Sequence, residues 1–246
     1  MSAKSDAYEK SIADSINVIK GMKAERPPGD TSLSDVLITK YMDKSTRAWV
    51  EVKMGHSDNL SNPRVFYKDN KWQTTYQTPA AKEAVRILNE SNQANDFLEK
   101  ISKFSGIPLK SIKIPTTQSG LKEEGAVPLF VMKNYFSQPG VNRYITNLEN
   151  YNIGKLVTEH YTKGKKEPTY YMQAGDDFYL ISSTNPLKLN RGIPLLSGHG
   201  DFKVRISTRS QFYEVQAEIK ITNMPNSKYS VAPGTIKSNP FNQEKK

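Results

Sequence analysis

Two short apolar segments near the amino end, each joined to acidic residues, constrain the fold of this chain most strongly. Asp35 stands immediately before the first segment, and Glu51-Val52-Lys53 ends the second, with 15 residues between Asp35 and Glu51. Because side chains alternate between the two faces of a strand, Glu51 and Lys53 should share one face while Val52 points to the other. We expect a hairpin of these two segments that places Asp35 beside Glu51 and Lys53.

The polar groups of this hairpin suit metal-dependent cleavage of a phosphodiester. Carboxylate oxygens of Asp35 and Glu51, with the main-chain carbonyl of Val52, match the oxygen ligands that Mg²⁺ prefers, and Mn²⁺ accepts the same ligand types. A cation held there would polarise the phosphoryl oxygen and stabilise the leaving 3′ oxygen. Lys53 would orient the attacking water or help to deprotonate it, and would balance the charge that builds on the phosphate.

The order of these residues along the chain resembles the PD-(D/E)xK nuclease superfamily. The matching residues are Glu9 in an expected first helix, Ser34-Asp35 at the start of one strand and Glu51-Val52-Lys53 on the next. The resemblance covers roughly the first half of the chain, and no proline is adjacent to Asp35. It implies an α/β (α+β) fold of the restriction-endonuclease-like type, with a mixed central sheet flanked by helices. It also implies a Mg²⁺-dependent DNA endonuclease, in which Glu9 would complete the metal shell through a water.

Two other sets of residues compete for the metal site. Asp30 lies upstream in a Pro/Gly turn signal and rivals Asp35 as the metal-binding aspartate. Asp201 precedes Glu218 and Lys220 with nearly the same spacing as the amino-terminal set. The segment that holds Glu218 and Lys220 alternates strictly between apolar and polar residues, which is the pattern of a half-solvated antiparallel strand and accounts for both charges without chemistry. The amino-terminal set is therefore preferred, and both rivals stay open.

The excess of basic residues favours a polyanionic partner. Lys and Arg number 35 against 25 Asp and Glu, which gives a formal net charge of +10 at pH 7. Each phosphate that a Lys or Arg neutralises releases condensed counterions, so such a chain is expected to bind DNA. The candidate contacts are basic residues interleaved with aromatic ones in one short stretch, and a later basic run. They are Arg64, Lys68, Lys71, Trp72, Lys163, Lys165 and Lys166.

Cysteine is absent and histidine is scarce, which limits the other classes of site. Without cysteine there is no disulfide and no thiolate zinc site, and three scattered histidines, among them the loop residue His56, argue against zinc. No apolar run is long enough to cross a bilayer or to act as a secretory signal. We therefore expect a cytoplasmic protein without a membrane partner, and a homodimer if both DNA strands are cut at one place.

The pattern of apolar residues and turn signals predicts helices and strands along the whole chain. Helices are expected at 5–23, from Thr78-Pro79 onward, at about 95–105 and near 141–162. Strands are expected at 35–40, 47–54, 65–67, 71–73, 128–132, 169–173, 177–182, 202–208 and 212–222.

This order of elements predicts three successive parts. Residues 1–137 would form the nuclease core, residues 138–224 a β-rich C-terminal extension packed on it, and residues 225–246 a polar tail that is extended or mobile. Two functions without catalysis remain as alternatives, because charge alone does not separate a nuclease from a binder. One is a non-enzymatic nucleic-acid-binding protein, and the other is a viral structural or assembly protein.

Overall fold

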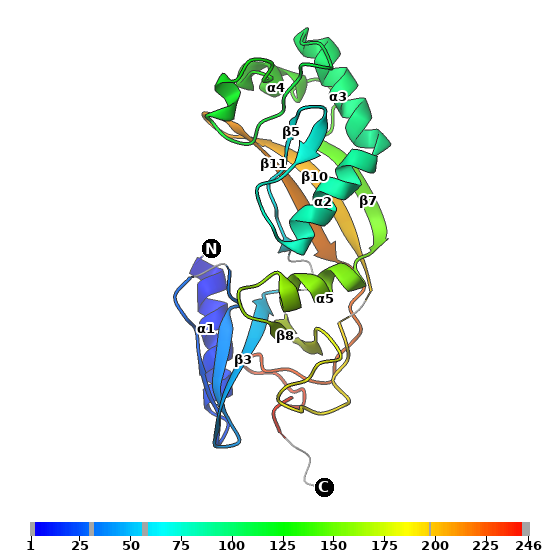
Figure 1. Ribbon diagram of the computed structural model, residues 1–246. Coiled ribbons are helices and arrows are strands. Elements are labelled where there is room, and N and C mark those ends of the chain that lie inside the picture. The colour runs from blue at the N-terminus through cyan, green and yellow to red at the C-terminus, as the bar shows by residue number, and fades with distance from the viewer. Residues whose placement is uncertain (1–2, 30–31, 56–58, 197, 243–246) are drawn as a thin grey trace. The chain divides into compact units, whose positions relative to one another are not determined.

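The chain folds into two compact units, each built from segments that are far apart in the sequence (Figure 1). The computed structural model describes residues 3–29, 32–55, 59–196 and 198–242. Unit 1 comprises residues 1–58, 152–199 and 221–246, and unit 2 comprises residues 59–151 and 200–220. Unit 2 is thus inserted into unit 1 at two points along the chain.

This division differs from the contiguous one that the sequence suggested. The expected nuclease core ended at residue 137, whereas unit 1 also takes in strands and a tail from the carboxyl-terminal half of the chain. Strand pairing explains the difference, because strands within residues 169–180 extend the sheet formed by residues 23–53. The expected β-rich extension, 138–224, is shared between the two units.

Unit 1 is built on a mixed five-stranded sheet in the order β1-β2-β3-β8-β9. Its strands are β1 (Lys23–Glu25), β2 (Val36–Tyr41), β3 (Lys44–Lys53), β8 (Thr169–Ala174) and β9 (Asp177–Leu180). β1, β2 and β3 are antiparallel neighbours, β8 runs parallel to β3, and β9 is antiparallel to β8. The four strands expected in these regions are confirmed to within a few residues at each end.

The β2–β3 hairpin closes through a two-residue turn at Met42 and Asp43. Both residues have positive φ, 51° and 63°, which is the backbone that a type I′ turn requires. Asp43 also forms an ion pair with Lys40 at 2.9 Å. The turn pairs Tyr41 with Lys44, and a shift of one residue between Ile38 and Lys40 then pairs Val36 with Val50. This shift decides which residues meet at the open end of the hairpin, because a change of register by one residue moves every side chain to the other face.

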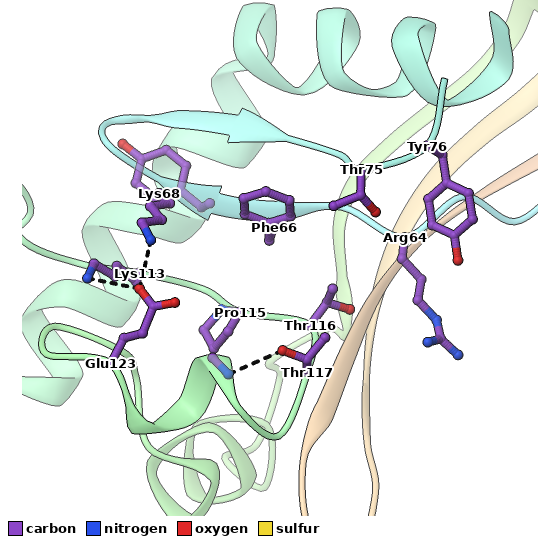
Figure 2. Close-up of a pocket in the computed structure, with 12 residues that line it drawn as sticks. Arg64, Phe66, Lys68, Thr75, Tyr76, Lys113, Pro115, Thr116, Thr117 and Glu123 are labelled. Atoms are coloured by element: carbon purple, nitrogen blue, oxygen red, sulfur yellow. Dashed lines mark hydrogen bonds and ion pairs between the residues drawn. The ribbon is translucent and has the colours of Figure 1, made fainter. Parts of the chain in front are cut away.

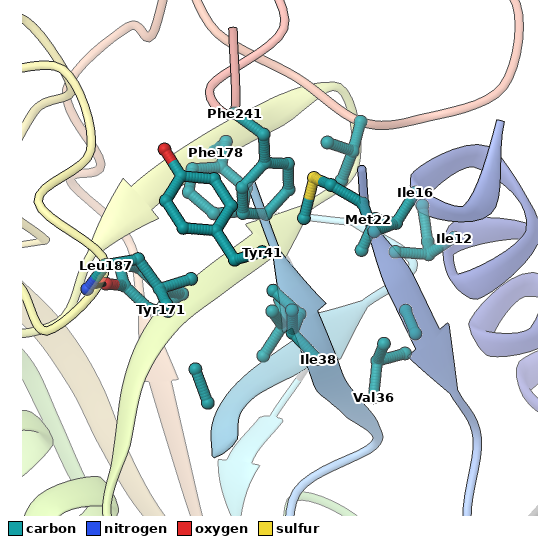
Figure 3. Close-up of a cluster of buried hydrophobic side chains, with 14 of the residues drawn as sticks. Ile12, Ile16, Met22, Val36, Ile38, Tyr41, Tyr171, Phe178, Leu187 and Phe241 are labelled. Atoms are coloured by element: carbon teal, nitrogen blue, oxygen red, sulfur yellow. Dashed lines mark hydrogen bonds between the residues drawn. The ribbon is translucent and has the colours of Figure 1, made fainter. Parts of the chain in front are cut away.

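Helices contact both faces of the unit 1 sheet. α1 (Ala3–Asn17) packs its apolar side on the face that carries Val50, where buried side chains form one cluster (Figure 3). α5 (Gly154–Lys163) meets the other face, because Tyr161 contacts Glu51, whose side chain alternates with that of Val50. Full burial of each such apolar side chain contributes about 1.5–3 kcal/mol, so this packing holds the hairpin in a fixed position.

The carboxyl-terminal segment belongs to the core of unit 1. Val231 and Phe241 are 3% and 4% exposed and join the buried cluster. The Phe241 ring lies against the rings of Tyr41 and Phe178, at centroid distances of 6.3 and 5.6 Å (Figure 3). The expectation of an extended or mobile tail at 225–246 is therefore wrong for the part that the structure describes, because apolar side chains between its polar residues anchor it.

Unit 2 combines a four-stranded sheet with helices and a short hairpin (Figure 1). The sheet has the order β4-β11-β10-β7. Its strands are β4 (Asn59–Ser61), β7 (Tyr144–Asn152), β10 (His199–Thr208) and β11 (Tyr213–Ile221). β5 (Phe66–Lys68) and β6 (Lys71–Gln73) form the hairpin, which turns at Asp69 and Asn70 with φ of 54° and 58°. The hairpin and the strands β10 and β11 were expected and are confirmed, whereas β7 was expected as part of a helix.

Side-chain caps and a glycine set the ends of the two longest helices of unit 2. α2 (Pro79–Glu90) starts after Thr78 and α3 (Asn92–Ser105) after Ser91, and each of these two side chains accepts a hydrogen bond from the first turn. Such a cap contributes about 1 kcal/mol. Gly106, at φ 72°, ends α3. Both helices were expected, and no helix among the described residues is long and apolar enough to span a membrane.

The expected strand at 128–132 is wrong. These residues lead into the short helix α4 (Leu129–Tyr135), which follows the one-turn 3₁₀ helix η1 (Gly120–Lys122). Met132 and Tyr135 are buried three residues apart, whereas Phe130 is 67% exposed. This spacing suits one face of a helix, and a short apolar run alone does not distinguish a helix from a strand.

Two expected helices also have different bounds. The segment near 141–162 is not one helix, because its first half forms the edge strand β7 and α5 begins only at Gly154. The first helix ends at Asn17 and not at residue 23, because the chain turns through Gly21, at φ 80°, and enters β1.

Candidate active site

Two acidic side chains and one ammonium group meet at the open end of the β2–β3 hairpin. The register of the hairpin, extended by one residue, places Asp35 opposite Glu51. The main-chain N–H of Val52 donates a hydrogen bond to Asp35 Oδ2 at 2.7 Å, and Lys53 Nζ lies 2.8 Å from Glu51 Oε1. The structure thus brings together three of the residues that the sequence marked as candidates for catalysis, and we name Asp35 and Glu51 the acidic pair.

α5 and the segment after it supply two further groups to Glu51. The Tyr161 hydroxyl donates a hydrogen bond to Glu51 Oε1 at 3.3 Å, and Lys165 Nζ lies 3.6 Å from Oε2. Lys165 Nζ also donates to the Leu33 carbonyl at 3.2 Å. From the sequence, Lys165 was expected only to bind DNA and Tyr161 was not singled out, because 110 residues separate this tyrosine from Glu51 and no local pattern links them.

The ion pairs keep Glu51 ionised in spite of its burial. Burial disfavours the carboxylate, but the ammonium groups of Lys53 and Lys165 outweigh this effect and lower the pKa of Glu51 to about 2. Burial likewise acts to lower the pKa of Lys53, whereas the charge of Glu51 raises that pKa above the usual value for lysine. Glu51 is therefore an anion and Lys53 a cation throughout the neutral range.

The pKa of Asp35 is shifted in the opposite direction from that of Glu51. Burial is the main cause that raises its pKa from 3.8 to about 7, the charge of Glu51 adds to the rise, and Lys53 and the hydrogen bond from Val52 oppose it. Two carboxylates that share one site resist ionising together. A cation held by oxygens of both residues would favour the ionised form of each, so the acidic pair is suited to a divalent cation.

The donor set of the site fits a hard divalent cation with oxygen ligands. Glu51 Oε2 is buried and accepts no hydrogen bond from the residues that the structure describes, and the Lys165 ammonium lies 3.6 Å from it. The described ranges contain no group of three His, Cys, Asp or Glu side chains that could hold a metal ion. A cation here would therefore be held by Asp35, Glu51, the Val52 carbonyl and water, and Mg²⁺ commonly keeps several waters.

The carboxylate of Glu9 is hydrogen-bonded to residues other than the acidic pair. Glu9 lies on α1 with 4% of its surface exposed, and its oxygens accept hydrogen bonds from Ser5 Oγ at 2.9 Å and Arg26 Nε at 2.7 Å. The raised pKa of Asp35 comes first from burial, and Glu9 is only a weaker cause. The carboxylate of Glu9 holds Arg26, and the expected contact of Glu9 with a metal through a water stays a prediction.

The rival sets of acids differ from the acidic pair in their surroundings. Asp30 lies outside the described residues, as does the loop histidine His56. Asp201 and Glu218 each have a separate basic partner within β10, at 3.4 and 2.8 Å. These pairs are the usual cross-strand and same-strand contacts of a solvated sheet face.

The residues expected to contact DNA fall into separate groups. Arg64, Lys68, Lys71 and Trp72 belong to unit 2, and Lys163, Lys165 and Lys166 belong to unit 1. Arg64 and Lys68 form ion pairs of 2.8 and 2.9 Å with acids of their own unit. Lys163 has 71% of its side chain exposed, and Lys71 and Lys166 are also exposed. Except for Lys165 and Trp72, these side chains lie on the surface, where a phosphate can reach them.

Trp72 is a core residue. It is 1% exposed, its ring meets that of Tyr67 edge-on at 5.3 Å, and its main-chain groups pair with the side chain of Asn89. The prediction that Trp72 contacts nucleic acid is therefore wrong. Strand alternation is the reason, because β6 turns Trp72 inward while Lys71 and Gln73 point the other way.

Trp72→Ala should lower the free energy of unfolding by about 3–5 kcal/mol, because it removes a fully buried ring from unit 2. Urea unfolding followed by circular dichroism measures this change. The neighbouring Lys71→Ala is the control, and should stay within about 0.5 kcal/mol of the wild type because Lys71 is exposed. A Trp72→Ala protein of unchanged stability but weaker DNA binding would contradict the burial of this side chain.

Comparison with known proteins identifies no relative. No protein-family model, no curated protein and no solved structure matches this chain. The function is therefore inferred from the geometry of the residues themselves.

Proposed function

We propose that this protein is a Mg²⁺-dependent deoxyribonuclease that hydrolyses phosphodiester bonds within DNA. The observation that carries the proposal is the meeting of Asp35, Glu51 and Lys53 at the end of one hairpin. One acid is held ionised and the other has its pKa raised to about 7, a pair of environments typical of functional sites. The net charge of +10 at pH 7 suits a polyanionic substrate.

The connectivity of unit 1 supports a restriction-endonuclease-like core. Along the chain, α1 is followed by the antiparallel strands β1, β2 and β3, then by α5, and then by β8 parallel to β3. The resemblance to the PD-(D/E)xK superfamily implies this order of helix, strands, helix and strand. Parallel strands need a crossover connection, and here residues 59–151 of unit 2 lie within that connection together with α5.

Each group of the hairpin has a distinct part in the proposed reaction. Asp35, Glu51 and the Val52 carbonyl would hold the cation, which would be Mg²⁺ or, in its place, Mn²⁺. Such a cation would supply Lewis-acid stabilisation of the charge on the phosphate. Lys53 keeps its proton at neutral pH because Glu51 raises its pKa against the effect of burial. It therefore acts as a hydrogen-bond donor to the attacking water or to a phosphate oxygen, and not as the base.

Tyr161 and Lys165 are positioning residues in this proposal. Both contact Glu51 from the side of α5, through Oε1 and Oε2 respectively. Lys165 is itself held by the Leu33 carbonyl, close to the chain that enters Asp35. These contacts fix the plane of the Glu51 carboxylate, which a cation site needs because ligand geometry around Mg²⁺ is strict.

A cleavage assay with the purified full-length protein tests the proposal. Supercoiled plasmid and linear DNA are incubated with MgCl₂, with MnCl₂ or with EDTA, and the products are separated on agarose. The expected result is conversion of supercoiled plasmid to nicked or linear forms with Mg²⁺, and none with EDTA. Cleavage that persists in EDTA, or plasmid that stays intact with either metal at an excess of protein, overturns the proposal.

A non-enzymatic nucleic-acid-binding protein is the second candidate. The ion pairs of Glu51 with Lys53 and Lys165 favour it, because a buried acid between two ammonium groups also forms a purely structural network. This candidate requires DNA binding that is the same in EDTA and in Mg²⁺, with the plasmid unchanged. The two functions therefore differ in the single measurement of metal-dependent cleavage.

A further inference from the structure

Unit 2 contains a pocket that the proposed hydrolysis does not use. Its volume is about 350 Å³, and it lies between the β5–β6 hairpin and the segment from Lys113 to Glu123 (Figure 2). All of its lining residues belong to unit 2, so the pocket is complete within one unit. Its volume falls within the range of small-molecule sites, about 300–1,000 Å³.

The walls of this pocket present flat apolar surfaces. Phe66 stands near the middle on β5, Tyr76 lies toward one end, and Pro115 comes from the opposite segment (Figure 2). Phe66 is half-buried and Tyr76 is 45% exposed. An exposed aromatic ring beside a hollow is a surface on which a nucleobase can stack, whatever its identity, because every base has a π face. Within this basic and aromatic stretch, Phe66 and Tyr76 are accessible where Trp72 is not.

The pocket also carries an excess of positive charge. Lys68 and Lys113 lie 2.9 and 3.1 Å from the same carboxylate oxygen of Glu123, so two ammonium groups share one negative charge. Glu123 is the one acid among the described lining residues. Arg64 lines the other end of the pocket beside Tyr76 (Figure 2), but its guanidinium is paired with Glu214 at 2.8 Å, so the excess positive charge comes from Lys68 and Lys113. A ligand that matches both features has a flat ring and a negative charge close to it, as a nucleotide does.

We propose that this pocket binds one unstacked nucleotide of single-stranded DNA. The base stacks on Tyr76 and Phe66, and a phosphate lies beside Lys68 and Lys113. The inference rests on the proposed function for the choice of DNA as the ligand, and it adds a second contact with that substrate. The pocket lies in unit 2 and the acidic pair lies in unit 1, so substitutions can remove either one without altering a residue of the other.

Binding is measured by fluorescence anisotropy in EDTA, with the full-length protein and a short labelled oligothymidylate. Tyr76→Ala should raise the Kd by about 5-fold or more, the loss expected for one base–aromatic stack. Tyr144→Ala is the matched control, because Tyr144 is an exposed tyrosine of unit 2, 38% accessible, that does not line the pocket. Phe66→Leu keeps the apolar volume but removes the ring, and should weaken binding in the same direction as Tyr76→Ala.

An abasic oligonucleotide of the same length separates stacking from charge. It keeps every phosphate and offers no base, so the wild type and Tyr76→Ala should bind it equally. The pocket is excluded as a base site if Tyr76→Ala and Tyr144→Ala bind oligothymidylate alike, or if Tyr76→Ala weakens abasic binding just as much. If Tyr76→Ala weakens binding only to DNA that has bases, and the wild type cleaves no DNA, the pocket proposal is supported and only the nuclease proposal is overturned. If the wild type cleaves DNA but the pocket variants bind DNA as tightly as the wild type, the nuclease proposal is supported and the pocket proposal is overturned.

Discussion

Lys53→Ala should lower the rate of plasmid cleavage by about 100-fold or more, the usual effect of removing one preorganised donor or acid–base group. The Lys53 ammonium lies 2.8 Å from Glu51 and stays charged in the neutral range because that carboxylate raises its pKa against the effect of burial. Alanine leaves no donor for the attacking water or for the developing charge of the phosphate. DNA binding in EDTA should stay within about twofold of the wild type, because many other cations contact phosphates.

Two further variants separate the charge of Lys53 from its packing and from net charge. Lys53→Met keeps the aliphatic part of the side chain and should lose cleavage as Lys53→Ala does. Lys40→Ala removes the same charge from β2 of the same sheet, where the side chain is 43% exposed and paired with Asp43, and should cleave at the wild-type rate. Thermal unfolding of each variant verifies that the protein is folded. Near-wild-type turnover in both folded Lys53 variants would remove this lysine from the reaction.

The hairpin that carries the acidic pair was predictable because its signals are local. Two strands are specified by an acid before one apolar run, by Asp43 at the turn and by a second run that ends in charged residues. The shift of one residue between Ile38 and Lys40, which sets the register at the open end, has no such local signal. The caps at Thr78 and Gly106 are local in the same way. Pairing of β3 with β8 is different, because it joins Trp49 to Thr169 across the whole inserted segment. No change of composition marks where unit 2 begins or ends, so the contiguous division of the chain had no means of detecting the insertion.

The candidate site shows the same limit. Asp35, Glu51 and Lys53 lie close in sequence and meet as expected, whereas Tyr161 and Lys165 reach Glu51 only through tertiary packing. The inward position of Trp72 was open to detection, since a polar, apolar, polar triplet on a strand buries its central residue.

The partner of Glu9, in contrast to the burial of Trp72, could not be predicted from the sequence. The spacing of Glu9 from the apolar residues of the first helix correctly put it at the edge of the core, but the spacing gave no sign that Arg26 would bind its carboxylate. A pattern within one element therefore locates a side chain relative to the core, and leaves its partner on another element undetermined.

Asp35→Asn should abolish cleavage and, without metal, make the protein more stable than the wild type at alkaline pH. Burial first, and then the charge of Glu51, raise the pKa of Asp35 from 3.8 to about 7. The native state therefore binds a proton more tightly than the unfolded chain, and this contribution to stability is complete below about pH 4 and is lost as the pH rises through about 7. Asparagine does not ionise, and its side-chain oxygen can still accept the N–H of Val52.

The size of this effect follows from the same pKa values. Between about pH 5 and pH 8, the free energy of unfolding of the wild type should fall relative to Asp35→Asn by about 2.6 kcal/mol. Glu51 does not disturb this window, because its pKa is lowered to about 2 and its contribution is lost only as the pH falls below about 4.5. Urea unfolding in EDTA at both pH values measures the difference.

Asp43→Asn is the matched control for this experiment, since it removes an exposed carboxylate from the turn of the same hairpin and asparagine tolerates the positive φ found there. Adding Mg²⁺ should restore stability to the wild type at pH 8 and leave Asp35→Asn unchanged, because only a state that binds the ion gains from it. If the free energy of unfolding of Asp35→Asn changes with pH as that of the wild type does, the ionised Asp35 side chain does not destabilise the fold. The expected result means that Asp35 lowers the stability of the metal-free protein while it is needed for activity. Such a trade-off is typical of a functional site that brings two like charges close together.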